Sequence, residues 1–359
     1  MGRRAFLYPF DISFAEIFKY KEQICISYDT IYPVVAQGLP YENMDVGIIC
    51  KDRKWHATVC SDYRELLSSC TDAIITNDSS DSMEAMRIAI SHNLNVVCLF
   101  PFRSRDIEQS VLQMCEKKGV SYTNYSSIQN YSYDHKNLEK TVLQDLSTPV
   151  VMICGMARDT QKFDVQLALR KEFLSQGYRV TQIGTKDYSA WFGMHPFPSF
   201  MFQPQHDIQK IFMFNEYIKK LEIEEKPDLI LLGIPGGTLP FDSLHPNDFG
   251  ILCYLASQAV AVDYTVFSAA FLEYERGYYP YIAKVLRYRY GVEKVVLHLS
   301  NVYHDIEDDE RTMKERLLRI GGSHVHDVLK KFPAKKVCTV ADVSSMRAIT
   351  NQIIEYLAS

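Results

Sequence analysis

The strongest constraint on the fold is a short apolar run that ends in a glycine and leads into an amphipathic helix. Residues 149–162 read PVVMICGMARDTQK, and residues 228–242 read DLILLGIPGGTLPFD, a second apolar run with a glycine turn. Apolar residues at three- and four-residue spacing follow the first turn, so the sequence predicts the order strand, loop, helix. Phosphate-binding loops are built on this scaffold, because the N–H groups at a helix N-terminus attract anions.

The same alternation of strand and helix covers most of the chain. In the first part we expect strands and helices in the following segments: strands Ala5–Tyr8, Gln23–Ser27, Val46–Cys50, Ala73–Asn77 and Val96–Phe100, and helices Tyr63–Ser69, Ser82–His92 and Arg105–Lys117. The second part continues with Val150–Cys154 as a strand, Lys162–Gln176 as a helix, and so on to a helix over Asp342–Leu357 that Asp342 and Ser344 would cap, with a helix also expected over Asp309–Leu318. Short connections between such elements predict mostly parallel sheets covered on both faces.

A chain of 359 residues is too long for one ordinary core, so we expect two domains. The segment from Tyr122 to Asp145, rich in Tyr, Asn and Ser, interrupts the alternation and is typical of a connection. The prediction is two doubly wound, mostly parallel α/β domains: a Rossmann-like domain over residues 1–125, a connecting segment over 126–147, and a degenerate P-loop-NTPase-like domain over 148–359.

Charge and cysteine content exclude several classes of protein. The net charge is -5 and no basic run stands out, which argues against a nucleic-acid or anionic-membrane surface. No apolar stretch is long enough to span a membrane, and the start of the chain lacks the apolar core of a signal peptide. Nine cysteines without a CxxC pair, several inside strand-like runs, indicate reduced thiols and a cytoplasmic protein.

The first glycine loop resembles that of dethiobiotin synthetase, which reads G-x5-G-K-S/T. When this pattern is aligned with the chain, Gly155 is the first glycine and Lys162 is the lysine. Gln161 stands in place of the second glycine, and Phe163 stands in place of the hydroxyl residue that binds magnesium. Arg158 and Lys162 could still hold an anion, whereas nearby acidic residues would oppose a polyphosphate. Three alternatives stay open: catalytic hydrolysis of a nucleotide, binding of an anion or nucleotide, and an ordinary loop without a ligand.

The second glycine loop follows the same comparison. Where the resemblance implies an acidic residue that supports magnesium, this chain has an apolar residue, Leu232, followed by Gly233. Gly236 and Gly237 would still let a ligand approach the backbone. We therefore expect no metal site, and a cofactor, if there is one, would be a nucleotide or another phosphate-containing ligand without a well-formed magnesium site.

The most unusual local sequence is GTKDYSAWFGMHPFPSFM, residues 184–201, which follows a predicted strand. Ligands of doubly wound folds bind at the carboxyl edge of the sheet, where this loop would lie. Two alternatives stay open: a surface for a peptide or an apolar ligand, and a buried loop that packs against the other domain. The residues concerned are the aromatic Tyr188, Trp191, Phe192, Phe197 and Phe200, the cation Lys186, and His195, the one nearby candidate for a catalytic acid or base.

Three long phrases carry a family resemblance: LYPFDISF, FDVQLALRKEFLSQGYRVTQIGTKDYSAWFGMHPFPSFMF and EEKPDLILLGIPGGTLPF. Together they resemble the peptide maturation system proteins encoded beside bacteriocin-type ribosomal peptide precursors. The resemblance implies a cytoplasmic role in maturing such a peptide, with the precursor peptide and a modifying enzyme, such as a radical SAM protein, or an acyl-carrier-like protein as partners. It supplies no catalytic residues, and it leaves open both homo-oligomerisation and an active transferase or ligase that uses a nucleotide or an acyl donor.

Overall fold

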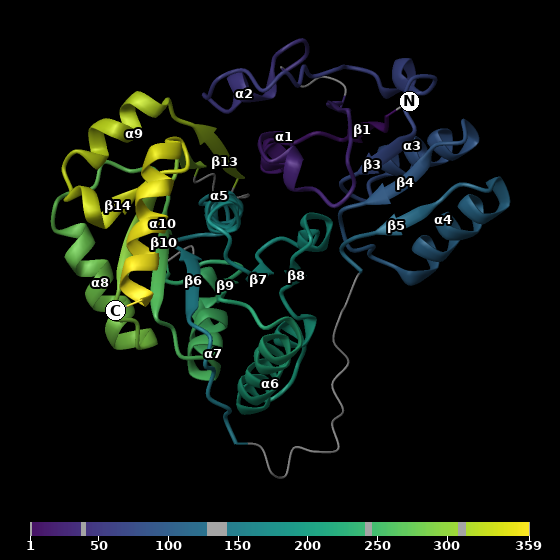
Figure 1. Cartoon of the computed structure of the whole chain (residues 1–359). Helices are drawn as coiled ribbons and strands as arrows, with labels where there is room; N and C mark the ends of the chain where they lie inside the picture. Colours follow the sequence, from purple (N-terminus) through teal and green to yellow (C-terminus); the bar gives the residue numbers. More distant parts are fainter. Residues whose placement is uncertain (1, 37–40, 128–141, 241–245, 308–313, 359) are drawn as a thin grey trace. The chain divides into compact units, whose positions relative to one another are not determined.

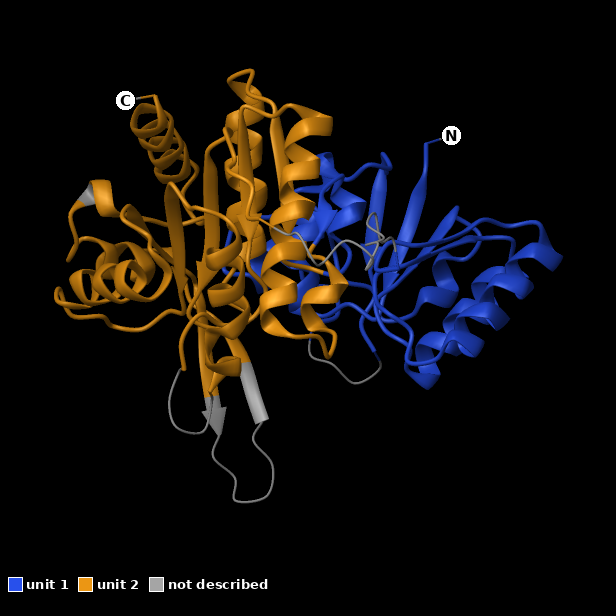
Figure 2. Cartoon of the chain, turned by 90° about the horizontal axis from the view of Figure 1, so that it is seen from below, with its two compact units in different colours: residues 1–128, 187–196 blue, residues 129–186, 197–359 orange. Residues whose placement is uncertain are grey.

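The computed structural model describes residues 2–36, 41–127, 142–240, 246–307 and 314–358 (Figure 1). The chain divides into two compact units, coloured in Figure 2: the first holds residues 1–128 and 187–196, and the second holds residues 129–186 and 197–359. Residues 187–196, which the sequence analysis places in the C-terminal domain, thus belong to the first unit. Among the described helices, none combines the length and apolar character needed to cross a membrane.

The first unit is a parallel sheet with strand order β2-β1-β3-β4-β5. Its elements are β1 (Arg4–Tyr8), α1 (Ala15–Lys19), β2 (Thr30–Pro33), α2 (Val46–Ile49), β3 (Asp72–Ile75), α3 (Ser80–Ser91), β4 (Asn95–Cys98), α4 (Arg105–Lys118) and β5 (Tyr122–Asn124). Strands β1 and β3 are buried along almost their whole length, as expected for a parallel sheet covered on both faces. The fold class predicted for this part is confirmed.

Helix α4 shows why the predicted helices form where they do. Ser104 caps its N-terminus by accepting a hydrogen bond from the N–H of Asp106 at 3.2 Å, and Gly119 ends it in the left-handed conformation at φ 72°. Acidic side chains lie in the first turn and lysines in the last, which complements the helix dipole. Only Val111 and Cys115 are buried, so one narrow stripe faces the sheet.

One predicted strand of this unit is wrong because a capping carboxylate outweighs β propensity. Val46–Ile49 of the predicted strand form helix α2, and Cys50 caps its C-terminus, although Val and Ile favour strands. Oδ1 of Asp45 accepts hydrogen bonds from the N–H groups of Gly47 and Trp55, each at 2.9 Å. The bond from Gly47 caps the first turn of the helix, and the bond from Trp55 holds the capping carboxylate in place.

The strand predicted over Gln23–Ser27 is also displaced. A single 3-10 turn ends at Gln23, and the strand occupies Thr30–Pro33 instead. Within the predicted segment the backbone N–H of Cys25 donates to the carbonyl of Trp191 at 2.9 Å. Cys25 therefore contacts the returning segment of the same unit, and residues 24–27 are not in a strand.

The second unit is also built on parallel strands, in the order β14-β11-β10-β6-β9-β7. Its strands are β6 (Val150–Gly155), β7 (Val180–Gly184), β9 (Leu229–Gly233), β10 (Tyr264–Ala269), β11 (Val295–Leu299) and β14 (Val337–Cys338). Its helices are α5 (Lys162–Ser175), α6 (Asp207–Glu225), α7 (Ile251–Ala259), α8 (Tyr278–Tyr290), α9 (Gly322–Leu329) and α10 (Val343–Leu357). Strand β6 lies between β9 and β10, so the glycine loops that follow β6 and β9 meet at one edge of the sheet.

Helices cover both faces of this sheet (Figure 1). Helices α5 and α10 pack on one face, where Phe173 and Ile353 are almost fully buried. Helices α6, α7, α8 and α9 pack on the other face, around residues such as Phe214 and Leu286. Each such side chain contributes about 1.5–3 kcal/mol by leaving water. The second unit thus provides the second α/β sheet that the sequence predicts.

The helix predicted over Asp309–Leu318 is wrong where the structure describes it. Residues 314–319 form strand β13 (Lys314–Arg319), which pairs antiparallel with β12 (Val302–Glu307). Residues 309–313 lie outside the described residues. The cap predicted for the last helix is confirmed, because Oδ1 of Asp342 accepts from the N–H of Ser344 at 2.8 Å.

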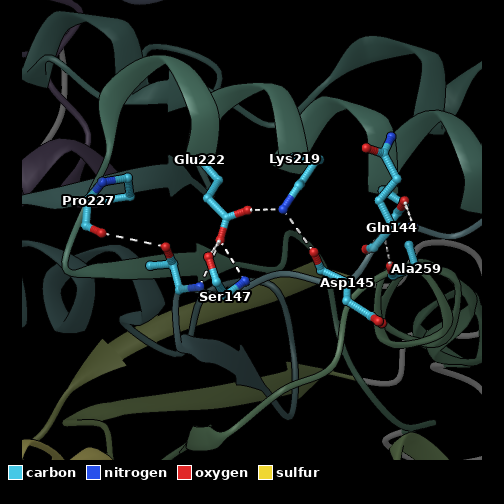
Figure 3. Close-up of polar contacts among 9 residues, drawn as sticks. Gln144, Asp145, Ser147, Lys219, Glu222, Pro227 and Ala259 are labelled. Carbon is cyan, nitrogen blue, oxygen red and sulfur yellow. Dashed lines mark hydrogen bonds and ion pairs between the residues drawn. The ribbon is translucent and has the colours of Figure 1, made fainter.

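Before strand β6, residues 144–148 run along helix α6 and are bound to it by hydrogen bonds (Figure 3). Oε1 of Glu222 accepts hydrogen bonds from the N–H groups of Ser147 and Thr148 at 2.8 and 2.7 Å, and Nζ of Lys219 donates to its Oε2 at 2.6 Å. Burial alone would raise the pKa of Glu222, but the bonds from Lys219, Thr148 and Ser147 outweigh it and lower the pKa to about 2. The carboxylate is therefore charged in the folded protein at neutral pH.

Candidate functional site

The loop between β6 and α5 begins at a glycine that the surrounding backbone requires. Both the N–H and the hydroxyl of Thr238 donate to the carbonyl of Gly155, at 2.8 and 2.7 Å. A Cβ on Gly155 would lie 2.6 Å from the Thr160 hydroxyl and 2.8 Å from the Ser268 carbonyl, closer than side chains are found. The loop that follows is thus held against the neighbouring strand ends.

Gln161 keeps the backbone conformation that a glycine usually has at such a loop. Its φ of 61° and ψ of 26° lie in the left-handed region, which costs a non-glycine residue about 1–2 kcal/mol. The side chain is anchored in return, because its Oε1 accepts from the hydroxyl of Ser300 at 3.0 Å and from the N–H of Asn301 at 2.9 Å. The glutamine therefore replaces the expected glycine without changing the local backbone path.

Lys162 is buried inside the loop. Its Nζ donates to the carbonyl oxygens of Ala157 and Arg158 at 2.5 and 2.7 Å, and only 3% of the residue is exposed. Burial lowers the pKa of Lys162 to about 7, although the nearby Asp159 acts in the opposite direction. The lysine is in the register that the sequence predicts, but the carbonyl groups of its own loop bind it.

Two further cationic side chains were predicted for this site. Arg158 is exposed on the loop, and Nζ of Lys186 lies 3.9 Å from Oδ1 of Asp159. The structure thus brings Lys186, which follows β7, to the same loop as Lys162. Asp159 partly balances the positive charge there.

The second glycine loop is tied to the first by an asparagine. Nδ2 of Asn247 donates to the carbonyls of Met156 and Leu239, at 3.0 and 2.9 Å. A Cβ on Gly237 would lie 2.6 Å from the Asn247 side chain, and Gly236 has a φ of 74°. Both glycines are therefore needed for the path of this loop, whether or not a ligand approaches them.

The two positions that would bind or support a magnesium ion are apolar and buried. Phe163 is 2% exposed and Leu232 is fully buried in the core beneath α6 and α7. Gly233 leaves room for the side chain of Gln166, which a Cβ would meet at 2.3 Å. Neither Phe163 nor Leu232 offers an oxygen atom, so these two positions do not fit a magnesium ion.

A buried serine and a buried histidine hold the loop between β6 and α5 in place through hydrogen bonds. Nε2 of His298 accepts from the N–H of Val340 at 3.2 Å, so its proton lies on Nδ1, which donates to the Ser268 hydroxyl at 2.7 Å. That hydroxyl donates in turn to the carbonyl of Thr160. Because the histidine donates to the serine and does not accept from it, the pair positions the loop and is not arranged as a nucleophile with its base.

The aromatic side chains of residues 184–201 lie in the interiors of the two units. Trp191 is fully buried in the first unit, with its ring 6.3 Å from that of Tyr28 and 6.1 Å from that of Tyr125. Tyr188 and Phe192 are 3% and 1% exposed in the same unit. These side chains pack as core residues of the first unit, and their role in binding a peptide or an apolar ligand stays a prediction.

The remaining residues of this segment divide between the units. Phe197 and Phe200 belong to the second unit, where they pack with Phe214 and Tyr217 in the core on the α6 face. His195 lies in the two-residue strand β8 (His195–Pro196) of the first unit and is half-buried. Its role as an acid or base stays a prediction.

Comparison with known proteins adds information about the fold. No protein-family model and no curated protein matches this chain. A solved structure of a DUF1611 family protein from Anabaena variabilis is similar over 98% of this chain and 100% of its own, at 12% identity and a TM-score of 0.62. This likeness shows the fold alone.

Two other solved structures match more loosely. The putative oxidoreductase YvaA from Bacillus subtilis matches at 13% identity over 51% of this chain and 44% of its own, with a TM-score of 0.27. The homoserine dehydrogenase of S. aureus matches at 9% identity over 62% of this chain and 51% of its own, with a TM-score of 0.28. At these scores neither bears on the site.

Sequence reasoning missed the residues that support the loop. Ser268 and His298 are polar positions near the carboxyl ends of mostly apolar strands, and both are fully buried. That interruption is a signal the sequence does contain, since buried polar groups need partners. Thr238 and Asn301 lie in loops and carry no comparable signal.

Proposed function

We propose that the second unit binds an anionic, phosphate-bearing ligand at the loop between β6 and α5, without magnesium-dependent hydrolysis. The observation that carries this proposal is the position of Lys162, whose Nζ is buried among the carbonyl groups of the loop. An anion at the start of α5 would meet the exposed Arg158 and the N-terminal N–H groups of the helix, and it would compete with the loop carbonyls for the Lys162 ammonium group. Lys186 is a further cation beside the loop.

The biological setting of this binding is taken from the family resemblance. We propose a cytoplasmic maturation protein for a ribosomally made peptide, which binds the precursor peptide or a modifying enzyme such as a radical SAM protein or an acyl-carrier-like protein. The ligand at the loop would then be a phosphate-bearing cofactor of that process. Phe163 and Leu232 support a binding role over hydrolysis, because neither provides a ligand for magnesium.

A second candidate function is an active transferase or ligase that uses a nucleotide or an acyl donor. The observation that favours it is again Lys162, because a buried lysine with a pKa of about 7 beside a candidate phosphate site is typical of catalytic groups. In this case the same loop would hold the phosphate part of the donor. Lys162→Met separates the two functions: a transferase would lose turnover of the peptide, whereas a binding protein would keep its peptide or protein partner.

The binding step itself can be tested by thermal-shift and calorimetric titration. The probes are ATP, GTP, an acyl-CoA and inorganic phosphate, each with the wild type, with Lys162→Met and with Lys171→Met. Lys171 is a matched control because it lies exposed on the same helix. We expect at least one phosphate-bearing probe to stabilise the wild type and Lys171→Met but not Lys162→Met. Equal responses of all three proteins, or no response at all, would contradict the proposal.

A further inference from the structure

A cavity of about 520 Å³ lies in the second unit, apart from the loop between β6 and α5. Its walls come from the segment after β10, which includes Phe271 and Glu273, from the end of β13 with Arg319, from α9 with Asp327, and from Lys331 just after that helix. This volume falls within the range of small-molecule sites. Figure 1 shows β13 and α9 next to each other in this unit.

The lining of the cavity combines an apolar wall with balanced charge. Phe271 and Val328 supply apolar surface, while Arg319 and Lys331 supply two positive charges and Glu273 and Asp327 supply two negative ones. A polyphosphate would be repelled by the two carboxylates, and a purely apolar ligand would cover charged groups without offering them any polar contact. The charge pattern therefore fits a ligand that carries one group of each sign.

The charged groups are not equivalent. Oδ1 of Asp327 already accepts from Lys330 at 2.8 Å, so Glu273 is the acid better placed to meet a ligand cation. Nη1 of Arg319 donates to Oδ1 of Asn301 at 3.1 Å, which fixes its guanidinium in the wall of the cavity. A fixed guanidinium is suited to a carboxylate, because its planar donors match the two oxygens.

We propose that this cavity binds a small zwitterionic ligand, whose carboxylate is held by Arg319 and Lys331 and whose ammonium group faces Glu273. Two sources share this chemistry, a free amino acid and a short peptide. The proposal does not depend on anion binding at the loop, because none of the three residues belongs to that loop. The two places are nevertheless connected, since the N–H of Asn301 donates to Gln161 at 2.9 Å.

The test is isothermal titration of the wild-type protein with free amino acids and with dipeptides. Analogues that lack one charge are titrated in parallel: N-acetyl amino acids, which have no ammonium group, and amino acid amides, which have no carboxylate. Inorganic phosphate is the probe for a simple anion site. The variants are Arg319→Gln, Lys331→Gln and Glu273→Gln, with Arg287→Gln on the exposed surface of α8 as the control.

We expect an amino acid or a dipeptide to bind, each analogue to bind at least about tenfold more weakly, and each cavity variant to lose affinity by a similar factor. The control should bind as the wild type does. Lys331 is exposed, so Lys331→Gln keeps the test valid if Arg319→Gln fails to fold. Binding of dipeptides alone would identify the peptide as the source. Absence of any binding, equal affinity for the analogues, or tighter binding of inorganic phosphate would overturn the proposal.

Discussion

The Nζ atom of Lys162 lies 2.5 Å from the carbonyl oxygen of Ala157, inside the loop that an anionic ligand would have to approach. In the sequence, this lysine is the one residue of the phosphate-loop pattern that is kept together with the first glycine. In the structure, its ammonium group binds carbonyl oxygens near the start of the loop, so the side chain links the end of the loop to its beginning.

Lys162 should make the stability of the second unit depend on pH. Its pKa is about 7 in the folded protein and near 10.5 when the chain is unfolded, so the unfolded chain binds more protons between these values. The free energy of unfolding should therefore rise with pH from about 7 towards 10. Lys162→Met should lack this increment, which urea unfolding at several pH values would measure as a difference between the two proteins. Parallel pH profiles would contradict the assigned burial of the ammonium group.

Gln161→Gly tests the left-handed position at the start of α5. Glycine would relieve about 1–2 kcal/mol of backbone strain, but it would remove the acceptor for Ser300 and Asn301, both of which are buried. Because two buried donors lose their partner, we expect the free energy of unfolding to fall by about 1–2 kcal/mol. A variant more stable than the wild type would show that the side-chain anchor is not significant.

The alternation of strand and helix could be predicted from the sequence, whereas the site could be predicted only in outline. Strand β6 was predicted to within one residue of its bounds, because VVMIC is a continuous apolar run before a glycine turn. The helical segment Val46–Ile49 was missed because its conformation depends on the Asp45 carboxylate, which contacts residues up to twelve positions away. Local pattern does not contain such contacts.

The same limit applies to the candidate site. Gly155 and Lys162 follow from spacing along the chain, but the partners of Lys162 are carbonyl groups, which every residue has. Burial of Trp191 could not be deduced either, because its neighbour Tyr28 is more than 160 positions away in the sequence. An aromatic loop that serves the core and one that serves a ligand have the same composition.

Glu222→Gln should destabilise the second unit by about 1–3 kcal/mol at neutral pH, because a charged acceptor for two backbone N–H groups is lost. Glu224→Gln is the matched control on the same helix, since its carboxylate is exposed and lies 3.8 Å from Lys220. Unfolding in urea would measure both. A similar, small effect of the two variants would contradict the role given to Glu222.

The contribution of Glu222 should also depend on pH. Its pKa is about 2 in the folded protein and near 4.5 in the unfolded chain. The stabilisation is therefore complete above pH 4.5 and is lost as the pH falls towards 2. The stability difference between the wild type and Glu222→Gln should shrink over this range, and a difference that stays constant would exclude the lowered pKa.

Trp191→Ala tests whether the aromatic segment serves the core. Because Trp191 is fully buried, its removal should cost about 3–5 kcal/mol in the first unit. Trp55, the other tryptophan of the chain, is half-buried, so Trp55→Ala should cost less. Thermal unfolding followed by circular dichroism would compare them. If Trp191→Ala left the melting temperature unchanged, the segment would not be a core element.

Magnesium should not influence binding at the loop. Phe163 and Leu232 occupy the two positions that would otherwise bind or support the ion, and both side chains are buried hydrocarbons. The affinity for a phosphate-bearing probe should therefore be equal in EDTA and in millimolar magnesium, apart from the complexation of the free nucleotide, which inorganic phosphate avoids. A strong gain of affinity with magnesium would show that other residues provide its ligands.

The most direct test of the proposed function is calorimetric titration of the protein with the phosphate-bearing probe that binds best, at pH 8 in two buffers with different ionisation enthalpies. With a pKa of about 7, Lys162 is mostly neutral at this pH, and a bound anion would raise its pKa. We expect uptake of close to one proton on binding to the wild type and to Lys171→Met, and neither binding nor uptake with Lys162→Met. Binding without proton uptake, or with equal uptake in Lys162→Met, would contradict the role of Lys162 in anion binding.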